Sequence, residues 1–269
     1  MFLDSIEVYI VQIVYLILTI LVLMVLGYFI GGIPTALLIS KSMGIDIRKY
    51  GSHNAGGTNV GRVIGKKQGI LVIVLDILKC YLPCLAVLLI FSLVEFDFLP
   101  KFGQLKELLV SLTAISCCIG HTFTPYAHFK GGKSVACFAG YILLVSPLIA
   151  LVGMAIFFSC LRFAKRVSVG SILGVPCCFV VSLVPTILDF TAFKDPNVFN
   201  GGAYLSSTVM LHITYLTSIT CLLLSVLVVI RHYSNIQRLK KGEEPETHFR
   251  HSVKGENLKE EIEKESESK

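Results

Sequence analysis

The chain consists of long apolar segments separated by short polar ones. Leucine, isoleucine, valine and phenylalanine dominate six stretches, and charged residues seldom interrupt them. Most of these stretches approach or exceed the roughly 20 apolar residues with which a helix spans a bilayer. The pattern therefore predicts membrane helices near residues 8–40, 70–94, 108–121, 134–162, 168–188 and 208–231.

Two of these segments are too long for one straight span. The first contains three glycines and Pro34, so we expect it to kink there or to end near a functional site. The segment 134–162 has Ser146–Pro147 near its middle. We interpret it as a helical hairpin, although two helices of about 14 residues would each be only about 21 Å long. A single crossing is the alternative.

Basic residues indicate which loops face the cytoplasm. Lys and Arg outnumber the one acid, Asp46, in the segment 41–67, and they are also concentrated at 162–166 and from Arg231 onward. The positive-inside rule places these regions in the cytoplasm, and it places the loops at 95–107 and 189–207 outside. The sequence predicts an all-α integral membrane protein with about seven transmembrane helices, an external N-terminus and a cytoplasmic C-terminus. A single crossing at 134–162 would instead put residues 162–166 outside.

Composition supports a membrane domain followed by a charged tail. The chain is 54% hydrophobic, with a mean hydropathy of +0.74, which is rare for soluble domains. Its first residues, MFLDSIE, carry two acids and no base, so we expect a retained first span instead of a cleaved signal peptide. We assign residues 1–241 to one membrane domain. Residues 242–269 are dense in charge, and we expect a solvated, disordered cytoplasmic tail.

The nine cysteines form no pattern of disulfide or metal ligands. No CxxC occurs, and two adjacent pairs lie inside apolar segments. We expect cysteine to serve as a small apolar packing residue. We expect no metal and no cofactor.

Three polar clusters lie on the predicted cytoplasmic side, at residues 44–69, 120–134 and 231–244. Each combines basic residues with small hydrogen-bonding ones. The net charge of +6 is compatible with anionic lipid headgroups or anionic substrates, and we expect no nucleic-acid partner. Helix bundling would bring the three clusters together.

The first two clusters have features of a phosphate site. In KGGK, residues 130–133, two glycines allow backbone N–H groups to approach an anion, and a helix N-terminus follows. Two interfacial lysines on a turn are the alternative. Ala127 stands where a Walker A loop needs glycine. The first cluster offers Arg62 as a phosphate-binding fork, together with small polar residues, although a glycine-rich linker would also be polar.

The other polar residues give weaker signals. His121, His128 and His232 accompany the clusters, but none is followed by the aspartate of an HxxxxD acyltransferase motif. Asp76 and Lys79 stand three residues apart inside a predicted span, and we expect a structural ion pair.

The three clusters together resemble the bacterial acyl-phosphate:glycerol-3-phosphate acyltransferase family. The similarity is carried, in order along most of the chain, by GGIPTALLISKSMGIDIRKYGSHNAGGTNVGRVIGKKQG (31–69), GHTFTPYAHFKGGKSVA (120–136), RVSVGS (166–171) and RHYSNIQRLKKGEE (231–244). The resemblance implies a small seven-helix protein of the bacterial cell membrane whose active site faces the cytoplasm. It also implies acyl transfer from acyl phosphate to the 1-position of sn-glycerol 3-phosphate, without a metal or nucleotide, to give lysophosphatidic acid and phosphate.

The resemblance also implies roles for particular residues. Catalytic roles fall on Ser52, Arg62, Lys133, His232 and Asn235. Substrate-binding roles fall on Asn54, Thr58, Asn59, Lys130, Gly131, Gly132, Ser168, Ser171, Arg238 and Glu243. Within these sets, Ser52 and Arg62 would hold glycerol phosphate, and residues 130–133 would hold the phosphate of the acyl donor.

The chain departs from the family at four positions without losing a charged group. The family commonly has glycine at His53, alanine at Gly57, glycine at Ser134 and threonine at Cys137. Ser134 remains a residue type that suits a helix N-cap.

Two other functions are compatible with parts of the pattern. A small transporter for an anionic solute would also use glycine-broken helices and basic residues, but the predicted outer loops carry no matching polar cluster. A metal-dependent headgroup transferase would need clustered aspartates, and neither DxxD nor DxxxD occurs.

Overall fold

The computed structural model describes residues 2–101, 104–191 and 215–247. Within these ranges all regular secondary structure is helical, with ten α-helices and two 3-10 turns. The α-helices are α1 Phe2–Gly32, α2 Thr35–Ser42, α3 Gly57–Val63, α4 Lys66–Leu93, α5 Leu105–Thr122, α6 Val135–Val145, α7 Pro147–Ala164, α8 Val167–Thr191, α9 Tyr215–Arg231 and α10 Tyr233–Lys241. The short turns are η1 Ile47–Lys49 and η2 Pro125–Ala127.

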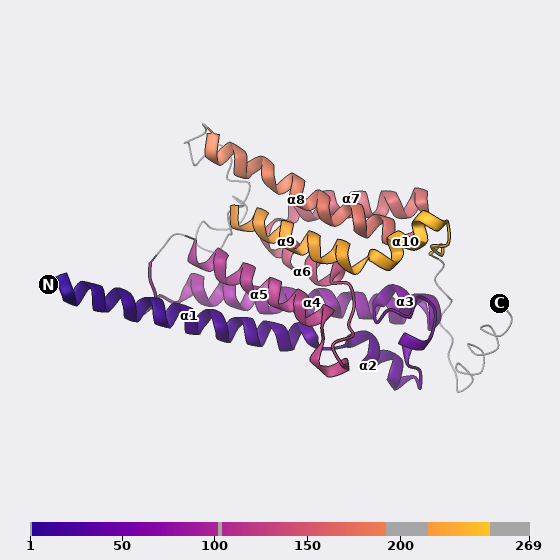
Figure 1. Ribbon diagram of the computed structural model, residues 1–269, viewed down its shortest axis with the longest axis horizontal. Coiled ribbons are helices and arrows are strands. Elements are labelled where there is room, and N and C mark those ends of the chain that lie inside the picture. Colours follow the sequence, from indigo (N-terminus) through magenta and orange to yellow (C-terminus); the bar gives the residue numbers. More distant parts are fainter. Residues whose placement is uncertain (1, 102–103, 192–214, 248–269) are drawn as a thin grey trace.

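The long helices lie side by side as a bundle (Figure 1). α1 begins at one end of the bundle, whereas α2, α3 and α10 lie at the other. In the described part of the chain, five helices are long and apolar enough to cross a membrane, or six if the bent pair α9 and α10 forms one span. These observations confirm the predicted all-α membrane architecture.

The first apolar segment breaks where its glycines and proline predicted a kink. α1 ends at Gly32, and α2 begins after Pro34. The Ile33 carbonyl at the break accepts hydrogen bonds from Lys79 Nζ at 2.8 Å and from Thr35 N–H at 3.0 Å. Just before it, α1 packs closely against α5, since a Cβ at Gly31 would overlap with the backbone of Cys117.

The long segment 134–162 breaks at Ser146–Pro147, as predicted. The Ser146 side chain accepts a hydrogen bond from the Ile149 N–H, and Pro147 begins α7. The two helices are unequal, however, with 11 residues in α6 and 18 in α7. Both lengths differ from the estimate of about 14 residues per helix, because α7 continues to Ala164 before Lys165 ends it in a left-handed conformation.

Cysteines contribute to the main core between α4, α5 and α6. Cys80, Cys84, Cys117, Cys118 and Cys137 are fully buried beside Tyr141. Their location agrees with the predicted role of cysteine as a small packing residue.

The structure also describes residues 242–247, the first part of the predicted tail. Thr247 N–H donates to the Lys165 carbonyl at 2.8 Å, and Val167 N–H donates to Thr247 Oγ1 at 3.1 Å. Arg166 Nε donates to the Glu244 carbonyl at 2.9 Å. These bonds hold residues 242–247 against the start of α8. The rest of the predicted tail lies outside the described residues, as do residues 192–214, which include most of one predicted outer loop and the start of the last predicted span.

Candidate active site

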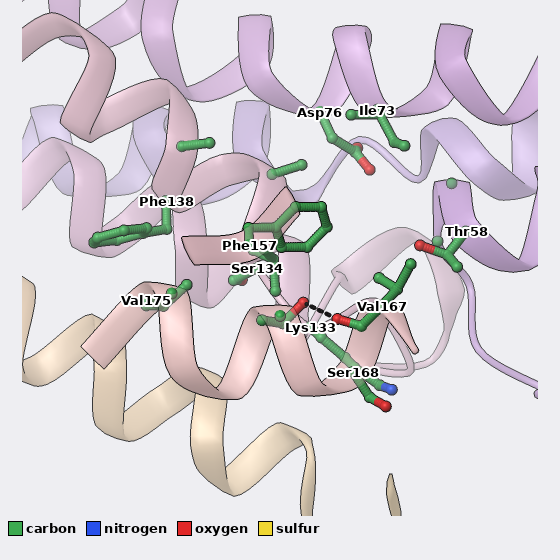
Figure 2. A pocket seen from close by; sticks show the side chains of 18 of the residues that line it. Thr58, Ile73, Asp76, Lys133, Ser134, Phe138, Phe157, Val167, Ser168 and Val175 are labelled. Carbon is green, nitrogen blue, oxygen red and sulfur yellow. Dashed lines mark hydrogen bonds between the residues drawn. The ribbon is translucent and has the colours of Figure 1, made fainter. Parts of the chain in front are cut away.

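A cavity of about 290 Å³ opens where the three polar clusters meet. One end is polar, and the other is lined by apolar residues of α6, α7 and α8. Figure 2 shows this division, with Thr58, Lys133 and Ser168 toward one side and Phe138 and Val175 toward the other.

Ten of the residues nominated from the sequence line this cavity. They are Ser52, Asn54, Thr58, Asn59, Arg62, Lys133, Ser168, Ser171, His232 and Asn235. They come from four separate places in the chain, 52–62, 133, 168–171 and 232–235, so the helix bundle gathers them as expected. Their roles in catalysis and binding stay predictions. Five other nominated residues do not line the cavity, namely Lys130, Gly131, Gly132, Arg238 and Glu243.

Arg62 brings a buried cationic donor to the polar end of the cavity. It lies on α3, and its Nε is buried without a hydrogen-bond partner among the described residues. Burial lowers the pKa of Arg62, while the nearby carboxylate of Glu244 raises it. An arginine side chain stays charged under these conditions. A buried charged donor without a partner is costly, so an anionic ligand would stabilise this arrangement.

Asn59 holds the glycine-rich loop in shape. Its Oδ1 accepts a hydrogen bond from Ser52 N–H at 2.9 Å. Its Nδ2 lies within 3.1 Å of the carbonyls of Ile47, Tyr50 and Asn54. Because the amide is occupied by the backbone, Asn59 positions Ser52 and Asn54 at the cavity wall. Direct contact between Asn59 and a substrate stays a prediction.

A chain of polar contacts joins the second and third clusters. Lys133 Nζ donates to Asn235 Oδ1, and Asn235 Nδ2 donates to Glu244 Oε1 at 2.6 Å. Arg238 Nε donates to the other Glu244 oxygen at 2.8 Å. Burial lowers the pKa of Lys133 to about 8, although Glu244 opposes the shift. Burial also raises the pKa of Glu244, but its hydrogen bonds outweigh this effect and leave the pKa lowered.

His232 is fixed in one tautomer by the end of α9. Its Nδ1 lies 2.8 Å from the Val228 carbonyl, which can only accept a hydrogen bond. The neutral ring therefore carries its proton on Nδ1 and keeps Nε2 as an acceptor. Since His232 is buried and lines the cavity, it can receive a hydrogen bond from a substrate hydroxyl.

The N-terminus of α6 reaches the cavity without a side-chain cap. Ser134 stands at the N-cap position, but its hydroxyl donates to the Cys118 carbonyl at 2.6 Å and pairs with Thr122 Oγ1 at 2.7 Å. It makes no capping hydrogen bond to its own helix. Val135 and Ala136 also line the cavity, so the positive end of the helix dipole faces it.

The two glycines of KGGK serve packing more than anion contact. Gly131 N–H donates to the Thr122 carbonyl at 3.1 Å, and Gly132 N–H donates to the His121 carbonyl at 3.0 Å. A Cβ at Gly132 would overlap with the imidazole of His121. These N–H groups are therefore not free for a phosphate, and the charge at the cavity comes from Lys133 instead.

Glu244 is a site residue that the sequence analysis missed. Glu243, which was nominated, is exposed, and only its backbone N–H bonds to the Arg238 carbonyl. Gly242 turns the chain in a left-handed conformation, and this turn buries Glu244. Glu243 and Glu244 are adjacent and of the same type, so nothing in the sequence favoured one of them as the buried residue.

Asp76 and Lys79 form the predicted structural ion pair, with Lys79 Nζ 2.8 Å from Asp76 Oδ1. The same oxygen accepts a hydrogen bond from Thr35 Oγ1 at 2.5 Å, and His121 Nδ1 lies 3.6 Å away. Thr35 belongs to α2, so its hydrogen bond to Asp76 ties α2 to α4, and Asp76 itself lines the cavity.

The apolar end of the cavity is shaped for a hydrocarbon group. Its walls include Phe138 and Ile142 of α6, Met154 and Phe157 of α7, and Val175 of α8. Figure 2 shows Phe157 between the polar and apolar parts. A ligand that fills both ends must carry an anionic group and an apolar chain.

Comparisons with known proteins agree with this reading. Residues 21–242 match the family model described as glycerol-3-phosphate acyltransferase. The chain is 32% identical to the glycerol-3-phosphate acyltransferase of Chlorobium chlorochromatii, over 86% of this chain and 98% of that protein. It is 36% identical to the enzyme of Staphylococcus haemolyticus, over 84% of this chain and 96% of that protein.

Solved structures show the same similarity. An integral membrane glycerol 3-phosphate acyltransferase (PlsY) in its glycerol 3-phosphate form has a TM-score of 0.67 and 28% identity, over 85% of this chain and 96% of that one. Its lysophosphatidic acid form has a TM-score of 0.65 and 27% identity, over 84% and 94% of the two chains. The chain therefore belongs to the glycerol-3-phosphate acyltransferase family.

Proposed function

We propose that the protein transfers a fatty acyl group from acyl phosphate to the 1-position of sn-glycerol 3-phosphate, in the first step of phospholipid biosynthesis. The products are lysophosphatidic acid and phosphate. The observation that carries this proposal is the single cavity that joins a cationic polar end to an apolar one. The relatives solved in glycerol 3-phosphate and lysophosphatidic acid forms support the choice of acceptor and product.

The two substrates divide the cavity between them. Arg62 and Ser52 bind the phosphate of glycerol 3-phosphate, and the apolar walls around Phe138 hold the acyl chain of the donor. Lys133 and the N-terminus of α6 bind the donor phosphate. This assignment places the acyl carbonyl at the junction of the polar and apolar ends.

The reaction is an acyl transfer in which the protein supplies position and charge. The 1-hydroxyl oxygen forms a bond to the acyl carbon, and the bond between this carbon and the bridging phosphate oxygen then breaks. Nε2 of His232 accepts a hydrogen bond from the 2-hydroxyl and so aligns the neighbouring 1-hydroxyl, whose own proton faces the donor phosphate. The departing phosphate takes the hydroxyl proton, and Lys133 neutralises its developing charge. Because acyl phosphate is already activated, this chemistry uses no metal or cofactor.

The proposed orientation follows from charge and from the helix lengths. Seven crossings result if α6 counts as a short span beside α1, α4, α5, α7, α8 and α9. The basic end of the bundle, with α2, α3 and α10, faces the cytoplasm, and the N-terminus of α1 lies outside. We place the protein in the bacterial plasma membrane.

A direct assay tests the proposed function. Purified protein in lipid nanodiscs receives palmitoyl phosphate and glycerol 3-phosphate, and both products are measured. We expect equal amounts of lysophosphatidic acid and inorganic phosphate. Absence of both products at a saturating donor concentration would overturn the assignment, and uptake of glycerol 3-phosphate into proteoliposomes would then favour a transporter.

A further inference from the structure

A second hollow, of about 700 Å³, borders the glycine-rich loop that also forms part of the catalytic cavity. Its walls come from η1, from the loop before KGGK and from the end of α9. We call it the basic basin and define it by Arg48, Lys49, His53, Asn54, Lys130 and Arg231. Its volume falls within the range of about 300–1,000 Å³ that is typical of small-molecule sites.

The charges in the basic basin are not balanced by the protein. Asp46 is the acid in its lining, and both of its oxygens are bound by Arg48, at 3.0 and 2.8 Å. Lys49, Lys130 and Arg231 have no ion-pair partner among the described residues. Three positive charges therefore face the basin without compensation, which favours an anionic occupant.

Arg231 gives a second, independent sign of a missing ligand. Its Nε is buried and has no hydrogen-bond partner in the described part of the chain. The guanidinium stacks over the ring of Phe123, 5.5 Å from its centroid, and this contact fixes its position. A phosphate oxygen would satisfy this donor, since arginine binds phosphate through planar, paired hydrogen bonds.

The basin adjoins the catalytic cavity. Asn54 lines both hollows, and Arg231 directly precedes His232, which lines the cavity. A small phosphate ester in the basin would thus lie across the loop 51–57 from Arg62.

We propose that the basic basin is a second phosphate-binding site, which receives soluble glycerol 3-phosphate before it passes Asn54 into the catalytic cavity. This inference rests on the proposed function. The basin raises the local concentration of the dianionic acceptor, and Asn59 holds the loop that separates the two hollows. A phosphate group of a membrane lipid has the same chemistry, and the experiment separates the two sources.

The first test compares two charge-neutralised pairs in neutral phosphatidylcholine nanodiscs. Lys49→Gln/Arg231→Gln removes two charges from the basin. Lys66→Gln/Lys67→Gln removes two exposed charges at the start of α4, which does not line the basin. For the basin variant we expect kcat/KM for glycerol 3-phosphate to fall about tenfold at low salt, with kcat within about twofold of wild type. The difference shrinks as KCl rises, because salt screens the field, and the control pair matches wild type.

Several outcomes would overturn the inference. One is an equal loss in both pairs, which indicates only a change in overall field. Another is a fall in kcat without salt dependence, which indicates structural damage. A third is an effect confined to anionic phosphatidylglycerol discs, which indicates a lipid headgroup in the basin. Lys49→Gln alone should lower kcat/KM about threefold. Because Lys49 is exposed, this single variant should fold normally, so it tests the inference even if the double variant misfolds.

A binding experiment separates this inference from the proposed function. The Arg62→Ala protein, disabled in its catalytic cavity, is titrated with glycerol 3-phosphate and followed by phosphorus NMR line broadening. We expect residual binding that disappears when Lys49→Gln/Arg231→Gln is added. If the wild-type protein makes lysophosphatidic acid but this residual binding is absent, the basin proposal fails and the proposed function stands. If binding is present but wild type makes no lysophosphatidic acid, the proposed function fails alone.

Discussion

The two glycine-rich loops, at residues 51–57 and 130–134, look alike in sequence but contribute to the cavity in different ways. In the first, one buried amide, Asn59, organises the backbone so that Ser52 and Asn54 line the cavity. In the second, both glycine N–H groups bond to carbonyls of α5, and Lys133 carries the charge into the site. In the first loop, the glycine-rich backbone therefore presents polar side chains to the cavity. In the second loop, the glycines allow the backbone to pack tightly against α5.

Arg62→Ala should have the largest effect on this comparison. It removes the charged side chain that α3, the helix after the first loop, places in the cavity, and we expect kcat/KM for glycerol 3-phosphate to fall about 10²–10³-fold. Steady-state kinetics with both substrates varied would measure it. Arg62→Lys retains the charge but loses the planar fork, so it should recover only part of the loss. Unchanged kinetics for Arg62→Ala would remove Arg62 from the site.

Lys133, in the second loop, should make kcat/KM depend on pH. The pKa of Lys133 is lowered to about 8, and phosphate binding needs the charged form. The value of kcat/KM should therefore fall as pH rises through about 8, because the amine loses its proton. Lys133→Arg should move this fall to higher pH, since guanidinium keeps its proton. An identical pH profile for wild type and Lys133→Arg would contradict the assignment.

Substitutions at the two KGGK glycines distinguish packing from anion contact. Gly132→Ala places a Cβ against the His121 imidazole, so the free energy of unfolding should fall by about 1–3 kcal/mol. Adding His121→Ala should relieve part of this clash. Gly131→Ala meets the His121 backbone carbonyl instead, so the same addition should not help. Thermal unfolding of the four variants in detergent provides the measurement. Wild-type stability for Gly132→Ala, with only KM for the donor changed, would restore the anion-cradle interpretation.

Asn59→Asp concerns the first loop, and its effect on stability should be similar to that of Gly132→Ala. The carboxylate keeps the acceptor for Ser52 N–H but loses the donor that faces three carbonyls. We expect a loss of about 1–3 kcal/mol in stability. Activity should fall through KM for glycerol 3-phosphate, because Ser52 is no longer held in place. A stable variant in which kcat alone falls would show that Asn59 acts on the reacting atoms.

The sequence predicted the elements better than the contacts. Apolar segments predicted the helices, and Pro34 and Pro147 predicted two breaks because proline is disfavoured in a helix interior. Proline alone does not decide a break, however, since Pro83 stands inside α4 and Pro176 and Pro185 stand inside α8. Basic and small polar residues predicted the three clusters that meet at the cavity. The lengths of the two helices on either side of Ser146–Pro147 were not predicted, because apolar composition alone does not fix where a helix ends.

Contacts between distant residues could not be predicted from local patterns. Glu244 is buried and Glu243 exposed because the left-handed Gly242 sets the direction of the following chain. The glycine N–H groups of KGGK bond to α5 because of the way the loop folds back on that helix. Both outcomes depend on tertiary packing, which the spacing of residue types along the chain does not determine.

The central claim is that the cavity aligns the glycerol hydroxyl with an acyl carbonyl. Glycerol 3-phosphate labelled with ¹⁸O at its 1-hydroxyl, given with unlabelled palmitoyl phosphate, tests it by mass spectrometry of both products. The proposed acyl transfer predicts that the label stays in the ester of lysophosphatidic acid and is absent from the released phosphate. A label in phosphate or diphosphate, or an ester without the label, would contradict it.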